Sequence, residues 1–561
     1  MQNLLDKILP KVSKPARYVG GEINSVKKDW DKVPLKILLS YPDAYEIGMS
    51  NLGIQILYDL INQKEDALAE RTFAPWPDME AEMRQNQLPL FSLENQRPAK
   101  DFDLWGFSMQ HELTYTNFLN MLDLAGLKLR AKDRAESDPI IFAGGPGTLN
   151  PAPLAPFFDF ILVGDAEDAI LEIIEVYKSN KDKSKSEKLA ALAKIEGVYV
   201  PGLTKSVKMR KVTDLNQTFC PTKPLVPNID VVHGRAVLEI MRGCKRGCRF
   251  CMAGYTLKPV RERSPENLLN YAKTLIDNTG YQELSLVSLS SSDYSKIEEL
   301  AKKLADELKK KKINIALPSL RLNNFTINLI QDILKVRSKN LTVAPEAGTQ
   351  RLRDVIRKDL SEAEILEGAK IAFAAGINSL KLYFMLGLPT ETEEDVKAIC
   401  ELSQKILKIG REVNKRTKVT VNLSTFVPKP HTPFQWEKQI TLEETLVKQN
   451  LIKHTLKKGK GIDLRWHQAE LSYLEGLLAR GDEQSADLIE AAWKAGARFD
   501  AWGDQFKYEP WQKAIETSGI KPIDYLRERK PDEKLPWDFI NVGISRDLLI
   551  REREKAHSCK K

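Results

Sequence analysis

The sequence predicts an α/β chain with two successive series of alternating strands and helices, followed by a mainly helical region. Residues 36–170 alternate short apolar runs with patterns of helical period, which is typical of βα units on a parallel sheet. A second alternating series begins near residue 236, and the strand signals stop after about residue 440. A chain of 561 residues is too long for one ordinary domain. We predict an N-terminal extension (1–35), a doubly wound, Rossmann-like domain (36–197), a connector (198–235), a barrel core (236–440) and a helical C-terminal region (441–561).

In the first series, each apolar run is followed by a helical pattern. KILLSYP, DFDLWGFSM and PIIFAGGPG are predicted strands, SNLGIQILYDLIN and TYTNFLNMLDLAG are predicted helices, and DFILVGDAEDAILEIIEVYK is a strand, an acidic turn and a helix. Open parallel sheets bind their ligands at the carboxyl ends of the strands. A ligand of this domain would therefore lie beside Ser108, Gly144, Gly145 and Gly164.

The second series predicts a partial (β/α)6, TIM-like barrel. AVLEIMRGC is a predicted strand that ends at a cysteine, and PENLLNYAKTLIDNTG is a helix with Ser264 as N-cap and Pro265 in its first turn. The later predicted strands are ELSLVSLSS, NIALPSLRL, LTVAPEAG, LKLYFMLGLPT and VTVNLSTFVPKP. Polar residues gather at the strand ends, where barrels of this kind carry their active sites.

The charge of the chain permits an anionic partner such as RNA but does not require one. Eighty-five Lys and Arg residues against 77 Asp and Glu residues give a net charge of +8, and the excess is spread along the chain. Strong nucleic-acid binders show a denser basic stripe. No apolar run is long enough to cross a membrane, and the N-terminus lacks the pattern of a secretory signal. We therefore expect no membrane partner and a cytoplasmic location.

Three of the six cysteines, Cys244, Cys248 and Cys251, form a C-x3-C-x2-C run. Three thiolates at this spacing can each bind a different iron of one cubane cluster. Structural zinc sites have four protein ligands, usually in paired C-x2-C units, and no second pair lies nearby in the sequence. The run therefore predicts a 4Fe-4S cluster in which one iron stays open to another ligand.

This run, with Phe250 before its last cysteine, resembles the signature of the radical S-adenosylmethionine (radical SAM) superfamily. The resemblance extends over about 230–435, because SLSSSDY, PSLRL, APEAG and FMLGLPTETEED follow in order, each at a predicted strand end. Over roughly 30–556, the chain is similar to a family of radical SAM proteins with an N-terminal cobalamin-binding-like domain. GMSNLGIQILYDLIN, FSMQHELTYTNFLNMLDLAG and CMAGYTLKPVRERSPENL carry that second resemblance.

The resemblance implies a reaction and a role for each matching residue. An electron from a donor such as flavodoxin or ferredoxin would pass through the cluster and cleave SAM to methionine and a 5′-deoxyadenosyl radical. The three cysteines would bind the cluster and Phe250 would pack beside the adenine of SAM. The remaining implied SAM contacts are Ser290 and Ser291 (amino group), Arg321 (carboxylate), Glu346 (ribose) and Gly387 and Pro389 (adenine wall). For each of these, the alternative is a purely structural residue at a strand end.

Cobalamin binding is less directly indicated. The residues placed to contact it are Ser108, Gly144, Gly145 and Gly164, but the D-x-H-x-x-G motif is missing. His111 is the only histidine of this domain, and a histidine in such a position is more often structural than a cobalt ligand. The leading hypothesis is a radical SAM enzyme that acts as a cobalamin-dependent methyl or alkyl transferase. The alternatives are a tRNA- or rRNA-modifying radical SAM enzyme without cobalamin and an iron-sulfur redox sensor or scaffold.

Overall fold

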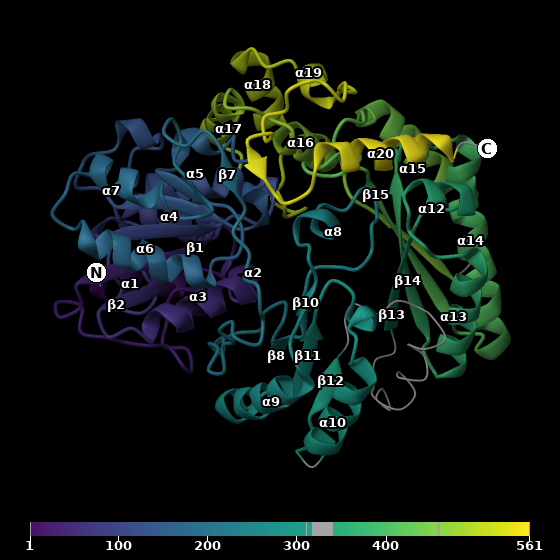
Figure 1. Ribbon diagram of the computed structural model, residues 1–561, viewed down its shortest axis with the longest axis horizontal. Helices are drawn as coiled ribbons and strands as arrows, with labels where there is room; N and C mark the ends of the chain where they lie inside the picture. The colour runs from purple at the N-terminus through teal and green to yellow at the C-terminus, as the bar shows by residue number, and fades with distance from the viewer. Residues whose placement is uncertain (1, 310, 317–339, 457–460, 560–561) are drawn as a thin grey trace.

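The computed structural model describes residues 2–309, 311–316, 340–456 and 461–559 (Figure 1). Figure 1 shows the first domain on the left, the second domain at the lower centre and right, and the C-terminal helices across the top of both. Within the described ranges, no helix is both long enough and apolar enough to span a membrane.

The first domain is built on a six-stranded sheet of order β2-β1-β3-β4-β5-β6. The strands β1 to β5 pair in parallel, and β6 is antiparallel to β5. They span Leu35–Tyr41 (β1), Ala67–Phe73 (β2), Leu104–Ser108 (β3), Ile140–Gly144 (β4), Phe160–Leu162 (β5) and Val198–Tyr199 (β6).

Helices cover both faces of this sheet, which confirms the predicted doubly wound fold. Ile37 and Leu39 of β1 pack with α3 (Leu52–Asn62) and α6 (Glu167–Ser179), whereas Leu38 packs on the other face with α4 (Pro77–Gln85) and α5 (Tyr115–Leu124). Successive side chains of a strand point to opposite faces, so an apolar strand buried on both sides needs two helical layers.

The strand β2 was not predicted, because charged residues interrupt its apolar pattern. Arg71 in the middle of β2 is fully buried between Glu22 and Glu94, at 2.9 Å (Nη2 to Oε2) and 2.7 Å (Nε to Oε1). A buried guanidinium is tolerated when carboxylates of this kind compensate its lost hydration. The two carboxylates that pair with Arg71 come from other parts of the chain, so the local sequence around Arg71 does not indicate them.

Among the described residues, the second domain contains two parallel sheets, of order β12-β11-β8 and β13-β14-β15-β16. All six predicted strands of the barrel core are present, which confirms the partial barrel. They span Ala236–Glu239 (β8), Glu283–Val287 (β11), Asn314–Ala316 (β12), Asn340–Glu346 (β13), Ser379–Leu386 (β14) and Lys418–Thr425 (β15). The helices α9 (Pro265–Thr279) and α10 (Ile297–Lys309) follow β8 and β11, and α13 (Glu362–Ala374), α14 (Glu393–Val413) and α15 (Leu442–Leu456) follow the later strands. As predicted, Ser264 caps α9 by accepting a hydrogen bond from the amide of Asn267 at 3.3 Å.

A further strand, β16 (Ile462–Trp466), contradicts the expectation that strands end near residue 440. It pairs in parallel with β15 and forms the edge of the sheet. None of its five residues is buried. The segment does alternate apolar and charged residues, but over only five positions between two helices, where so short a pattern is easily overlooked. Ile462 and Leu464 pack, partly buried, against the core of the sheet.

The C-terminal helices contact both domains. They are α16 (Ala469–Ala479), α17 (Ser485–Lys494), α18 (Glu509–Ser518), α19 (Pro522–Leu526) and α20 (Arg546–Ser558). The helix α17 packs against α5 of the first domain, and α20 packs against α12 (Gln350–Val355) of the second. A short strand, β17 (Ile540–Asn541), also pairs with β7 (Val207–Lys208) of the connector. The C-terminal region therefore fixes the two domains relative to each other.

We predict that Arg71→Met destabilises the protein by about 3–5 kcal/mol, because it leaves Glu22 and Glu94 buried without a cation. Arg84→Met is the matched control: Arg84 pairs with Glu80 and Asp123 but its side chain is 43% exposed. We expect that control to cost no more than about 1 kcal/mol. Denaturant unfolding followed by circular dichroism measures both, and equal losses would show that the buried network is not stabilising.

Candidate functional site

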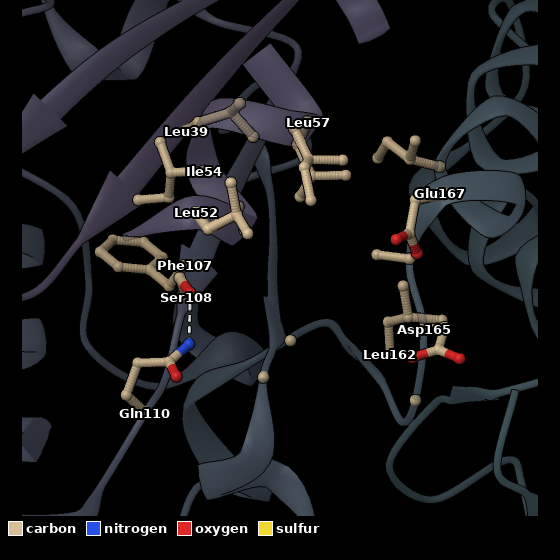
Figure 2. Close-up of a pocket in the computed structure, with 18 of the residues that line it drawn as sticks. Leu39, Leu52, Ile54, Leu57, Phe107, Ser108, Gln110, Leu162, Asp165 and Glu167 are labelled. Atoms are coloured by element: carbon tan, nitrogen blue, oxygen red, sulfur yellow. Dashed lines mark hydrogen bonds between the residues drawn. The ribbon is translucent and has the colours of Figure 1, made fainter. Parts of the chain in front are cut away.

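A cavity of about 290 Å³ lies at the carboxyl ends of the first domain's strands. Ser108, Gly144, Gly145 and Gly164, which the sequence placed at these ends, all line it. Figure 2 shows Leu39, Leu52, Ile54, Leu57 and Leu162 around the same space, with Ser108 accepting a hydrogen bond from the amide of Gln110 at 2.8 Å. A mostly apolar cavity with a few polar groups is typical of a ligand site.

Two glycines shape the cavity in different ways. At Gly164 the backbone has φ +119°, and a Cβ atom there would come within 2.1 Å of the carbonyl oxygen of Arg210. This position needs glycine because the loop after β5 lies directly against the connector. At Gly144 a Cβ atom would meet only the carbonyl oxygen of Leu162, at 3.8 Å. The missing side chain at Gly144 therefore leaves open space for a ligand.

The cysteine run forms a loop that an antiparallel pair of short strands closes. The strand β9 (Met241–Arg242) precedes the loop and pairs with β10 (Arg261–Glu262), which follows it. Within the loop, the amide of Arg246 donates a hydrogen bond to Sγ of Cys244 at 3.4 Å, and the amide of Cys251 donates to the carbonyl of Cys248 at 3.0 Å. Amide hydrogen bonds to sulfur are among the features by which proteins tune iron-sulfur clusters.

The three sulfur atoms lie close enough together to influence one another. Burial raises the pKa of the Cys248 thiol to about 11, and the neighbouring Cys251 and Cys244 contribute to the rise, whereas Lys358 opposes it. Cluster assembly must therefore displace protons from buried thiols.

In the described ranges, no three His, Cys, Asp or Glu side chains converge on a point where one metal ion would bind. The C-x3-C-x2-C run supplies three thiolates, one for each of three irons of a cubane, whereas a structural zinc ion takes four protein ligands. The donor set therefore fits a cluster better than a single zinc ion.

Phe250 and Glu346 lie on the barrel side of the cysteine loop. Phe250 packs with Ala347, Leu388 and Phe426, which directly follow β13 or lie just beyond the ends of β14 and β15. Glu346 ends β13 with φ +67° and pairs with Lys358 at 3.1 Å. Burial raises the pKa of Glu346 and Lys358 opposes the rise. Both Glu346 and Lys358 are close enough to Cys248 to affect the pKa of its thiol.

The other implied SAM residues have more varied surroundings. Ser290 donates a hydrogen bond to Asp293 at 2.8 Å, and Ser291 is fully buried with its hydroxyl 2.9 Å from that of Ser288. Gly387, with φ +80°, and Pro389 lie buried just after β14. Arg321 lies outside the described residues. The roles of these residues stay predictions.

Sequence reasoning missed the charged wall that joins the two sites. Glu239 and Arg242, which immediately precede the cysteine loop, line the first-domain cavity together with Asp165 and Glu167. No local motif marks these residues; the only available signal was the position of Asp165 and Glu167 just after a predicted strand. His111 does not line the cavity. It lies near Asp43 and Glu475: burial raises the pKa of the Asp43 carboxyl group, whereas Lys429 holds the pKa of the Glu475 carboxyl group below its usual range against the effect of burial.

Two family models match the chain. A model of the N-terminal region of radical SAM proteins matches residues 53–201, and a model of the radical SAM superfamily matches residues 238–403. Together they span more than half of the chain.

Curated relatives match over different lengths. An uncharacterized protein of Methanocaldococcus jannaschii is 30% identical over 466 residues, which are 82% of this chain and 91% of that protein. A tRNA-2-methylthio-N(6)-dimethylallyladenosine synthase of a Hydrogenobaculum species is 24% identical over 225 residues, which are 37% of this chain and 50% of that enzyme. The second match spans only half of that enzyme's length.

Among solved structures, the cobalamin-dependent SAM radical enzyme OxsB, with aqua-cobalamin and SAM bound, has a similar fold. Its TM-score is 0.50 at 13% identity, and the match covers 94% of this chain and 79% of OxsB. At this identity the likeness concerns the arrangement of the domains and not the residues of the sites. With the cysteine loop, the partial barrel and both family models in agreement, the chain belongs to the radical SAM superfamily and is an enzyme of that type.

Proposed function

We propose that this radical SAM enzyme uses a 4Fe-4S cluster, SAM and cobalamin to transfer a methyl or alkyl group to its substrate. One observation carries the proposal: the first-domain cavity and the cysteine loop share a wall, because Glu239 and Arg242 line the cavity and the loop begins directly after Arg242. A group can transfer between two cofactors only over a short, aligned distance. The likeness to OxsB in fold supports the same arrangement of domains.

On the cluster side, Cys244, Cys248 and Cys251 would hold the irons, and Glu346 would orient the ribose hydroxyls of SAM. Lys358 holds the Glu346 carboxylate in place in the structure described here. Phe250 would pack against the adenine from its apolar surroundings. When bound, the cluster supplies the electron that cleaves SAM, and cobalamin supplies a carrier for the transferred group. A low-potential protein such as flavodoxin or ferredoxin would deliver that electron.

The cavity fits part of a cobalamin molecule. Its apolar lining and the open space at Gly144 suit a flat aromatic group, and its volume of about 290 Å³ is near the lower end of ordinary ligand pockets. No histidine is found among the residues that line it, all of which are described. The cavity wall would offer no imidazole to the cobalt. Because the apolar cavity suits the benzimidazole of cobalamin and would draw it away from the cobalt, we expect bound cobalamin to be base-off.

A cobalamin-free, RNA-modifying enzyme is the second candidate, favoured by the match of part of the chain to a tRNA-modifying synthase. The purified protein would then bind RNA with an affinity that falls steeply as salt rises. The redox-sensor hypothesis predicts no SAM cleavage, which disagrees with membership of an enzyme superfamily.

Replacing Cys248 with Ala should abolish the cluster, because two thiolates cannot hold the cubane that three hold. Iron content after anaerobic reconstitution and the EPR signal of the reduced protein measure the loss. Cys220→Ala is the control, since Cys220 lies in the connector, outside the C-x3-C-x2-C run. Full iron retention in Cys248→Ala would place the cluster elsewhere.

Glu346→Gln should weaken SAM binding and slow the release of 5′-deoxyadenosine while iron content stays at the wild-type level. The amide keeps the shape of the side chain but accepts hydrogen bonds more weakly than a carboxylate. Titration of the reduced EPR signal with SAM measures the affinity, with Glu362→Gln, on the exposed surface of α13, as control. Iron loss in Glu346→Gln would show that Glu346 is structural.

Gly144→Val should block cobalamin without affecting the cluster, because its side chain would fill the cavity and meets no backbone obstacle. Gly145 is unsuitable for this test, since its φ of +99° would strain any side chain. Gly503→Val is the control, because no atom lies within 4 Å of a Cβ there. The measurement is cobalamin retained per protein after anaerobic gel filtration with methylcobalamin in excess. If the wild type retains none, the cobalamin-free candidate takes first place.

A further inference from the structure

The base of the cysteine loop lies against the first domain. In the antiparallel pair of β9 and β10, Arg242 lies opposite Arg261 and Met241 lies opposite Glu262. The two arginines therefore stand side by side at the start and the end of the loop. We call the pair of β9 and β10 the ribbon; an antiparallel pair of this kind fixes the direction in which the enclosed loop leaves it.

Arg242 binds three carboxylates at once. Its guanidinium lies 3.0 Å from Oδ1 of Asp165, 2.7 Å from Oε1 of Glu167 and 2.8 Å from Oε2 of Glu239. Asp165 and Glu167 belong to the first domain, and Glu239 belongs to β8 of the second. All four side chains are at most 16% exposed and line the cavity. The planar fork of arginine suits such multiple, directional contacts, which a lysine would not reproduce.

Arg261 adds a second contact to the same loop of the first domain. Its Nη1 lies 2.6 Å from Oδ2 of Asp165 and donates to the carbonyl of Val212 at 2.7 Å. The Asp165 carboxylate also accepts a hydrogen bond from the amide of Val212 at 2.9 Å. Asp165 thus receives both arginines of the ribbon, one on each carboxylate oxygen.

Of the four other basic residues between Arg242 and Arg261, three form ion pairs outside the first domain, and Lys258 lies over the ring of Tyr255. Lys245 pairs with Glu262, Arg246 with Asp293 and Arg249 with Glu552, all in the second domain or the C-terminal region. Of the basic residues in and beside the loop, the two arginines of the ribbon are therefore the ones that attach the loop to the cavity rim, that is, to Asp165 and Glu167.

We propose that Arg242, supported by Arg261, is a positioning residue that fixes the cysteine loop relative to a ligand in the first-domain cavity. This inference rests on the proposed function, because it takes cobalamin as that ligand. The contacts are made to the cavity rim, so they act on the distance and orientation between the two sites. Arg242 lines the cavity, but its guanidinium is already paired with three carboxylates; the cysteines would hold the cluster, and the apolar wall beside Gly144 would hold the ligand.

The test uses the full chain with a reconstituted cluster and bound cob(II)alamin, reduced so that both centres are paramagnetic. EPR then reports the magnetic interaction between them, which depends steeply on their separation. The variant is Arg242→Gln. Arg210→Gln is the matched control, because Arg210 of the connector lies against Gly164 but pairs with Glu172 of α6 and not with the cysteine loop. Glu167→Gln is a second test variant, which keeps Arg242 paired with Asp165 and Glu239 should Arg242→Gln fail to fold.

We expect Arg242→Gln to retain wild-type iron and cobalamin while the magnetic interaction is at least halved, with a smaller loss in Glu167→Gln and none in Arg210→Gln. An unchanged interaction in Arg242→Gln and Glu167→Gln would overturn the positioning role and leave the proposed function intact. Loss of cobalamin with iron retained would make Arg242 a ligand contact instead, which also overturns the inference. If the wild type itself retains no cobalamin, the proposed function fails, and the inference fails with it.

Discussion

The arrangement of both sites depends on the ion pairs between the base of the cysteine loop and the rim of the first domain. Arg242 and Arg261 share the single carboxylate of Asp165, and Arg242 also contacts Glu167 and Glu239. Charges with so little exposure are costly to bury, and their geometry must be well satisfied to compensate that cost. A pairing of this kind permits few alternative arrangements. The cavity and the cysteine loop consequently share one wall, although they belong to different domains.

Parallel pairing explains why polar and small residues from separate segments meet in each domain. In the first domain, β1, β3, β4 and β5 all end at the same edge, so Ser108, Gly144 and Gly164 surround one cavity. In the second domain, the ends of β13, β14 and β15 bring Glu346 and the apolar surroundings of Phe250 beside the cysteine loop. Ligand sites at the carboxyl ends of strands are a general property of such sheets.

The C-terminal region holds this geometry from outside. Its helix α17 shares an apolar core with α5 of the first domain, while Glu552 of α20 lies 3.3 Å from Arg249 in the cysteine loop. Glu552 also pairs with Arg357 at 3.2 Å, next to Lys358, which pairs with Glu346. A region that touches both domains limits their relative motion, as the proposed transfer between two cofactors would require.

The sequence by itself determined the two βα series, the cysteine run and the residues at the strand ends, because these depend on local periodicity and on spacing along the chain. It therefore predicted that one edge of the first sheet carries Ser108, Gly144, Gly145 and Gly164. Only the tertiary structure decided what depends on distant partners. The strand β2 carries Arg71, whose acceptors Glu22 and Glu94 lie far away in the sequence. The pair of Arg242 and Asp165 could not be predicted for the same reason. Two buried charges compensate each other only where the fold brings distant segments together, and the local sequence does not indicate which segments meet.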